Sequence, residues 1–213
     1  IYNENIYFEL EDSAQSIRNK NAFCVSDFKE MHIMSDIHAD YNKGQLQDIQ
    51  THDKFIINCG DTSGNVKDTI DYIQKNVSFG VFTHGNHLGY SGKETIEDSI
   101  ELLKETFPLS GDVSYLNNMY KEVNGVIFIG CCLYTDFGLY GNEKKDLYKQ
   151  LAQNGMNDFR YVKTRDKGKV RLVTPDDYEE WHKESLRYLS ETTLKFMNKP
   201  VVGNVFLQNG FSA

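Results

Sequence analysis

Side chains that bind metals or transfer protons lie at the ends of three apolar, strand-like stretches of this sequence, in the first half of residues 31–40, at 54–59 and at 78–83. They are Asp36 and His38, then Asp61, then Asn86 and His87. A carboxylate and an imidazole two positions apart can bind one cation at a strand end, because the chain turns there and strand alternation no longer separates them. An isolated Asp-x-His pair is more often a turn aspartate beside a surface histidine. The recurrence at three strand ends therefore carries the metal-site prediction.

The elements that would position these side chains alternate between strands and amphipathic helices over residues 30–108. Asn65 can cap the first helix with Asp68 at its N3 position, and Pro108 closes the second. This alternation predicts a parallel sheet with right-handed crossovers, and ligands bind at the carboxyl ends of its strands. A carboxylate on the middle strand can bridge two cations. Such a two-metal site, ~3.5–4 Å across, suits in-line displacement at phosphorus.

The second half of the chain is expected to change to short strands and longer helices. The expected elements are strands at 113–116, 119–123 and 126–133, a helix at 144–153, a polar loop at 157–169, a helix from 175 to about 197 and a buried strand that starts at 201. A hairpin turn is marked by Asn124-Gly125, and Thr174 with Asp177 marks the start of the long helix. The expected buried residues of that helix are Tyr178, Trp181, Leu186, Leu189 and Phe196.

Composition limits the possible partners of this 213-residue chain. The formal net charge of -8 argues against a broad nucleic-acid-binding surface, although bound metal can supply local positive charge for a small phosphorylated substrate. The longest apolar run, residues 126–134, is too short to span a bilayer, and no basic and apolar leader opens the chain. The four cysteines lack C-x-x-C spacing, which predicts free thiols in a reducing compartment. We therefore expect a cytoplasmic protein without a membrane partner.

Three short motifs resemble those of a known enzyme family. S-D-I-H at 35–38, C-G-D at 59–61 and H-G-N-H at 84–87 look like the first three motifs of the calcineurin-like metallophosphoesterases, and G-C-C-L-Y-T-D-F and M-N-D-F-R extend the similarity over residues 30–202. The resemblance implies an α/β/β/α sandwich of two mixed sheets flanked by helices. It also implies hydrolysis of phosphomonoesters or phosphodiesters at a dinuclear centre of two divalent ions (manganese, iron, zinc or nickel).

The resemblance also implies a role for each motif residue. By position, Asp36 and His38 would bind the first metal, Asp61 would bridge the two, and Asn86 would bind the second. His87 would lie beside the scissile phosphate, stabilise charge and protonate the leaving oxygen, with a metal-activated water as nucleophile.

The sequence departs from the family pattern at two places. Leu88 stands where many members carry Asp or Glu. No histidine follows His182, although the family has a further His and a Gly-His-x-His motif after its last strands. We therefore expect an irregular extension at 1–29, a partial domain at 30–202 that is truncated at its C-terminus, and an atypical tail at 203–213. The metallophosphoesterase would then be catalytically impaired. A non-catalytic binding scaffold and a mononuclear hydrolase are the alternatives.

Several further polar residues have two possible roles each. Asn157, Asp158 and Arg160 could line the mouth of a substrate site, or they could form an ordinary loop salt bridge. His84 could support the site from behind or be purely structural, and His182 is expected to have a packing or surface role.

Overall fold

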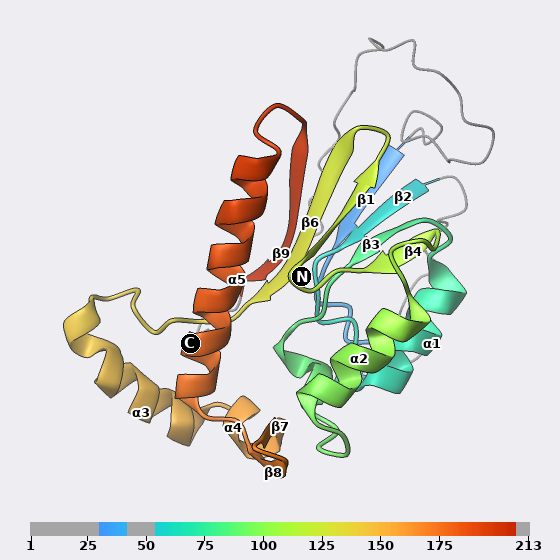
Figure 1. The fold of residues 1–213 in the computed structure, drawn as a ribbon. Helices are drawn as coiled ribbons and strands as arrows, with labels where there is room; N and C mark the ends of the chain where they lie inside the picture. Colours follow the sequence, from blue (N-terminus) through green and yellow to red (C-terminus); the bar gives the residue numbers. More distant parts are fainter. Residues whose placement is uncertain (1–29, 42–53, 208–213) are drawn as a thin grey trace.

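The computed structural model describes residues 30–41 and 54–207. These residues form a mixed α/β fold in which two sheets lie face to face, with helices on their outer faces (Figure 1). The expected α/β class is therefore confirmed. The predictions for residues 1–29, for a short helix near 45–50 and for residues 208–213 lie outside the described residues.

The first sheet contains four parallel strands whose order in space is their order in the chain. They are β1 (Glu30–Met34), β2 (Lys54–Asn58), β3 (Gly80–Phe82) and β4 (Val113–Tyr115). The crossover helices are α1 (Val66–Asn76), after β2, and α2 (Ile96–Thr106), after β3. The predicted cap of α1 is confirmed, since the Asn65 side chain accepts a hydrogen bond from the backbone N–H of Asp68 at 2.8 Å.

The second sheet is mixed, with strand order β5-β6-β9. Strands β5 (Met119–Val123) and β6 (Val126–Leu133) form the predicted hairpin, and β9 (Val201–Leu207) pairs parallel to β6. The expectation of two mixed sheets thus holds for this sheet and not for the first, which is wholly parallel among its described strands. Because β9 continues to Leu207, the expected boundary between residues 202 and 203 lies inside a strand.

A short 3₁₀-helix, η2 (Asn86–Gly89), follows β3. The remaining elements lie between β6 and β9, and they are the 3₁₀-helix η3 (Asn142–Lys144), α3 (Lys145–Gly155), α4 (Asp158–Tyr161), β7 (Lys163–Asp166), β8 (Lys169–Leu172) and α5 (Pro175–Lys195). The polar loop expected at 157–169 is wrong, because α4 and β7 occupy it. Two apolar side chains explain the difference: Phe159 is 2% exposed and Val162 is 1% exposed, so this short stretch is anchored in the core.

Helix α5 covers the outer face of the second sheet, and it begins at the predicted Thr174 cap. Its buried face agrees with the expected one at Tyr178, which is fully buried, and differs from it at Leu186. Leu186 is 48% exposed, whereas the neighbouring Ser185 is buried and its hydroxyl donates to the carbonyl of Cys132 on β6. The close approach of α5 to the sheet therefore uses small residues at this point in place of leucine.

The core has two parts because the first sheet is buried on both faces. Phe55 and Ile57 of β2 face the second sheet, where they meet Phe128 of β6. Ile56 points the other way, to the cluster that contains Ile73 of α1. This alternation follows from the period of a strand. Each such side chain contributes about 1.5–3 kcal/mol when fully buried.

Two further observations concern the described residues as a whole. None of their helices is long and apolar enough to cross a lipid bilayer. The described cysteines, Cys59, Cys131 and Cys132, are free thiols, as predicted.

Candidate metal centre

The carboxyl ends of β1 and β2 are joined by backbone hydrogen bonds that bring the first two motifs together. The Asp36 N–H donates to the carbonyl of Gly60 at 3.1 Å, and the His38 N–H donates to the carbonyl of Asp61 at 3.0 Å. Asp36, His38 and Asp61 have φ values of 55°, 46° and 48°, a left-handed conformation that is uncommon outside glycine. Residues in such conformations concentrate at functional sites, where surrounding contacts hold them.

Three of the five predicted site residues converge. Metal-binding atoms of His38, Asp61 and His87 all lie within 4.8 Å of one another. The rings of His38 and His87 are 4.6 Å apart between centroids, and Nε2 of His87 lies 4.0 Å from Oδ2 of Asp61. Asp61 is buried and both histidines are half-buried. The cluster thus joins two predicted ligands to the predicted acid.

Gly85 allows the third motif to approach Asp61. A Cβ atom at position 85 would lie 2.0 Å from Oδ1 of Asp61 and 2.8 Å from its backbone nitrogen. The same Oδ1 accepts a hydrogen bond from the backbone N–H of His87 at 3.1 Å. Any residue can adopt the φ of -109° at position 85, so the backbone conformation does not require glycine. Glycine is required because a Cβ atom would collide with Asp61.

The electrostatics of the cluster favour a cation. The pKa of Asp61 is raised to about 7, mainly by burial and also by the nearby carboxylates of Asp36, Asp158 and Asp40, although the backbone hydrogen bond from His87 lowers it. Burial and the neighbouring His38 lower the pKa of His87. A neutral imidazole is the form that binds a metal. A bound cation would offset the repulsion between the buried Asp61 carboxylate and the acidic groups around it.

Unsatisfied polar atoms test whether these residues fit a metal. Nδ1 of His38, Nδ1 of His87 and Oδ1 of Asp40 are buried and have no hydrogen-bond partner. Buried polar atoms without partners are rare and costly in folded proteins. Two imidazoles and a carboxylate are a donor set that suits zinc, iron, nickel or manganese. The residues present therefore fit a transition-metal ion.

Asp36 and Asn86, the other two predicted ligands, lie outside that group of three. The Asp36 side chain is exposed and accepts a hydrogen bond from the hydroxyl of its neighbour Ser35. The Asn86 side chain is 8% exposed, and its Nδ2 donates to Oδ1 of Asp158 at 2.9 Å. With its nitrogen engaged in this way, Asn86 has its carbonyl oxygen left as the atom for a metal.

Asp158 is the residue that sequence reasoning placed least well. It is 2% exposed and accepts hydrogen bonds from Asn86, from Tyr90 at 2.7 Å and from Tyr178 at 2.9 Å. It therefore orients Asn86 from behind. Arg160 donates to the carbonyl of Asn154. The signal for Asp158 was its position in the M-N-D-F-R run, but the sequence alone does not show its burial.

Asp40 was not singled out from the sequence, although it ends the same S-D-I-H-A-D run. A Cβ atom at Gly64 would lie 2.7 Å from its Oδ2, so this glycine leaves room for the carboxylate. His84 has a structural position: its Nδ1 lies 2.6 Å from the hydroxyl of Tyr115 and its Nε2 lies 3.2 Å from that of Tyr134.

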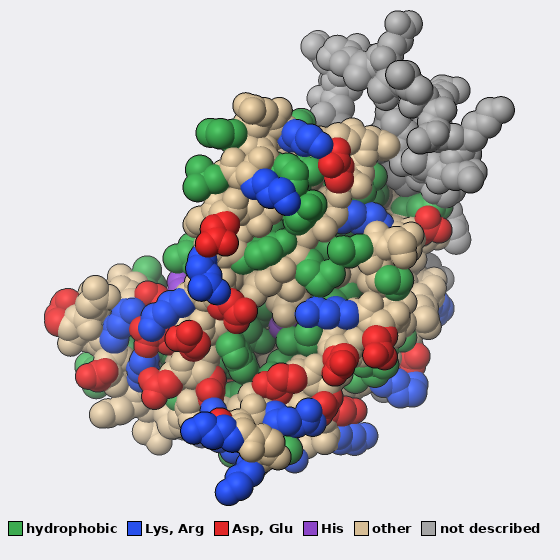
Figure 2. Space-filling model, in the orientation of Figure 1, with side chains coloured by type: hydrophobic (Ala, Val, Ile, Leu, Met, Phe, Trp, Pro, Cys, Tyr) green, Lys and Arg blue, Asp and Glu red, His purple; other side chains and the backbone are tan. Residues whose placement is uncertain are grey.

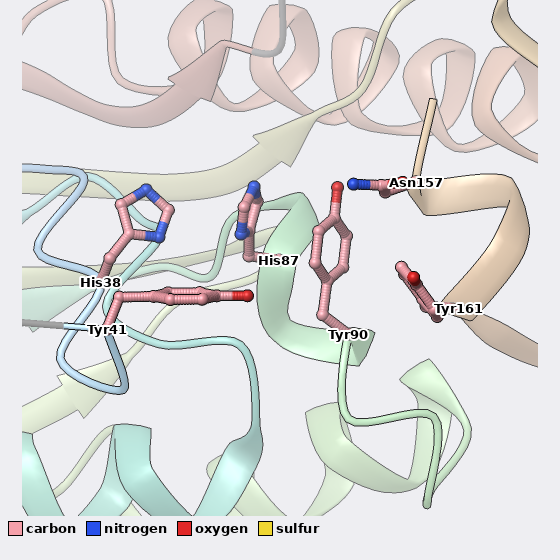
Figure 3. Close-up of a pocket in the computed structure, with 6 residues that line it drawn as sticks. All are labelled: His38, Tyr41, His87, Tyr90, Asn157 and Tyr161. Carbon is pink, nitrogen blue, oxygen red and sulfur yellow. The ribbon is translucent and has the colours of Figure 1, made fainter. Parts of the chain in front are cut away.

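The cluster opens into a cavity of about 570 Å³ (Figure 3). Its lining residues are His38, Tyr41, His87, Tyr90, Asn157 and Tyr161. The ring of Tyr90 stacks on that of His87 at 4.0 Å between centroids, with 19° between the ring planes. The volume is within the range of about 300–1,000 Å³ that is typical of small-molecule sites.

Comparison with known proteins adds a distant viral relative. No protein-family model matches the chain. An uncharacterized protein of Acanthamoeba polyphaga mimivirus is 27% identical over 124 residues, which are 57% of this chain and 41% of the viral protein. The match thus spans less than half of the relative's length.

Proposed function

We propose that this chain is a metal-dependent hydrolase that cleaves a phosphoester bond of a small phosphorylated substrate at a dinuclear site. The observation that carries the proposal is the convergence of His38, Asp61 and His87 at the carboxyl ends of parallel strands. The resemblance of the three motifs to calcineurin-like metallophosphoesterases supports the same reaction class.

In the proposed centre, Asp36, His38 and Asp61 would hold one ion, and Asp61 with Asn86 would hold the second. When bound, the two ions would polarise the phosphate and activate a water molecule as nucleophile. The chain itself sets the position of each donor. Asp158 fixes the amide of Asn86, and the backbone N–H of His87 fixes the carboxylate of Asp61.

His87 is proposed to protonate the leaving oxygen. Tyr90 holds one face of its ring by stacking, and the hydroxyl of Tyr90 is in turn tied to Asp158. The His87 ring is therefore positioned by its stacking on Tyr90, and Tyr90 is itself held by its hydrogen bond to Asp158. Because burial lowers the pKa of His87, its protonated form is a stronger acid than an exposed histidinium and transfers its proton more readily.

The test is a metal count combined with turnover. The purified chain is stripped with a chelator, reloaded separately with manganese, zinc, nickel or iron, and analysed by elemental mass spectrometry and with 4-nitrophenyl phosphate and its diester. We expect two ions per chain, with the second bound more weakly, and slow turnover, because the shared Asp61 and the neutral Asn86 are the proposed ligands of the second ion. Asp61→Asn should lose both, while Asp146→Asn, an exposed carboxylate on α3, should lose neither. Unchanged metal content in Asp61→Asn would contradict the assignment.

A non-catalytic binding scaffold is the second candidate, and the position of Asp36 favours it. This carboxylate is exposed and lies outside the group of three converging side chains. The same measurements separate the candidates. No bound metal and no turnover would support the scaffold, whereas one ion with turnover would support a mononuclear hydrolase.

A further inference from the structure

The cavity beside the metal cluster is unusually aromatic for a site that would bind a phosphate alone. Three tyrosines line it with the two histidines: Tyr41, Tyr90 and Tyr161. Figure 3 shows their rings arranged around the opening, with Asn157 above Tyr161. A phosphate is recognised by positive charge and hydrogen-bond donors, so an aromatic ring face does not contribute to phosphate binding. The rings require a different explanation.

The three tyrosines differ in the contacts that they already make within the protein. Both the ring and the hydroxyl of Tyr90 have partners, since the ring stacks on His87 and the hydroxyl donates to Asp158. Tyr161 is 48% exposed, and its ring meets that of Tyr90 only at a tilt, 6.0 Å between centroids. Tyr41 is 73% exposed, and Figure 3 shows its ring below His38 and His87, on the far side of Tyr90 from Tyr161. Two tyrosine rings thus present open surface to the cavity.

Asn157 and Tyr161 lie four positions apart at the two ends of α4 (Asp158–Tyr161), so their side chains share one face of the turn. Both line the cavity. Within the part of the chain that the structure describes, neither the carboxamide of Asn157 nor the hydroxyl of Tyr161 has a hydrogen-bond partner. α4 therefore offers a flat apolar ring and a donor–acceptor pair together.

We propose that the organic part of the substrate carries a flat aromatic ring system that stacks on Tyr161, with its phosphate at His38 and His87. This inference rests on the proposed phosphoesterase function. Aromatic side chains stack on any flat ring, and a carboxamide can donate to and accept from a ring edge at once. A nucleobase offers both features, and a simple aryl group offers only the first. The net charge of -8 favours a free small ester over a long nucleic acid.

The experiment compares esters that release the same kind of alcohol, so that leaving-group chemistry cancels. Adenosine 5′-monophosphate is paired with ribose 5-phosphate, and 2-phenylethyl phosphate is paired with butyl phosphate. We expect kcat/KM to be about 5- to 150-fold higher for the ring-bearing member of each pair, the range of one stacking contact. Asn157→Ala should lower kcat/KM for the nucleotide alone if a nucleobase is read.

Variants of Tyr161 assign the effect to stacking. Tyr161→Ala should remove most of the preference for the ring-bearing ester, and Tyr161→Phe should keep it. Tyr140→Ala is the matched control, because Tyr140 is 59% exposed and contacts Tyr148, outside the cavity. An equal loss in the Tyr140 variant would contradict the assignment to Tyr161.

A binding measurement separates this inference from the proposed function. Adenosine, which has no phosphate, is titrated into the metal-free chain and its binding is followed by saturation-transfer NMR, with and without Tyr161→Ala. Equal kcat/KM within each ester pair would overturn the aromatic preference and leave the phosphoesterase intact. Tyr161-dependent adenosine binding without turnover of any ester would overturn the phosphoesterase and leave the ring-binding site. Neither binding nor turnover would overturn both.

Discussion

His87 can act in two ways at this site, because its imidazole lies within ligand distance of the cluster and also faces the cavity. If it is the acid, His87→Ala should keep the metal content and lower turnover by about 10²–10⁴-fold, the usual loss for a general acid. Elemental analysis and steady-state kinetics of the same preparation provide the measurement. Loss of metal together with activity would reassign His87 as a ligand.

Backbone conformation at single residues also supports the site. Asp36, His38 and Asp61 are left-handed, and none of them is glycine. A left-handed conformation costs roughly 1–2 kcal/mol for most residues, although aspartate tolerates it better than bulky side chains do. Phe137 and Lys167 are left-handed as well, so the conformation alone does not mark a functional residue. It supports the proposed site together with the convergence of His38 and Asp61.

At the scale of elements, the loop after β3 must touch the end of β2, and Gly85 is the contact point. Gly85→Ala places a methyl group 2.0 Å from Oδ1 of Asp61. We expect the loop to shift, with a loss of about 1–3 kcal/mol in the free energy of unfolding and weaker metal binding. Denaturant unfolding and metal titration measure the two effects.

The matched control for Gly85 is Gly155→Ala at the end of α3, where an added Cβ has no neighbour within 4 Å. This variant should leave both quantities unchanged within error. If Gly85→Ala behaved like Gly155→Ala, the loop after β3 would not lie as close to Asp61 as the structure places it.

Helices α3 and α5 are joined by a group of charges centred on Glu179. Lys149 donates to its carboxylate, and Lys183 and Lys145 lie within 3.1 Å and 3.4 Å. The hydrogen bond from Lys149 is the main reason that the pKa of Glu179 is lowered to about 2 from 4.5. Because the folded-state pKa is lower than the unfolded one, the stabilisation is complete above about pH 4.5 and is lost as the pH falls toward 2.

We therefore expect Glu179→Gln to flatten the fall in stability between about pH 4.5 and pH 2, and to destabilise the chain slightly at pH 7. Glu180→Gln, the exposed neighbour, should follow the wild-type pH curve. Thermal unfolding at a series of pH values is the measurement. Parallel curves for Glu179→Gln and wild type would show that this carboxylate keeps an ordinary pKa.

At the scale of the whole molecule, β9 links the second sheet to the metal centre. Phe206 of β9 is 8% exposed and lies against Gly60, where an added Cβ would be 2.5 Å from its ring. Phe206→Ala should lower the free energy of unfolding by about 3–5 kcal/mol, as measured by denaturant unfolding. It should also weaken metal binding, because Gly60 directly precedes Asp61.

Val205→Ala is the control for Phe206, since its half-buried side chain points to the other face of the same strand. A smaller loss of stability with unchanged metal binding is expected there. Equal effects of the two substitutions would mean that β9 supports the fold without supporting the site.

The local sequence predicted what is local in this structure. The Asn65 and Thr174 caps, the hairpin at Asn124 and the parallel pairing of β1, β2 and β3 all follow from short patterns. The parallel pairing of β4 with β3 was not predicted. Contacts between distant segments were not predictable in the same way. Asp158 looked like a polar loop residue, and only packing against Asn86 and Tyr178 gives it its place.

The distance along the chain between Asn86 and Asp158 also sets the order in which the molecule can be completed during translation. These partners are 72 positions apart, so at about 5–20 residues per second the ribosome needs roughly 4–14 s to deliver the aspartate after the asparagine. During that interval β1 to β4 can pair, but Phe55 and Val81 have no second sheet to cover them until β6 emerges. The nascent chain therefore passes through a stage in which one apolar face of its first sheet is exposed to solvent. A chaperone that binds apolar β-sheet surface would act at this stage.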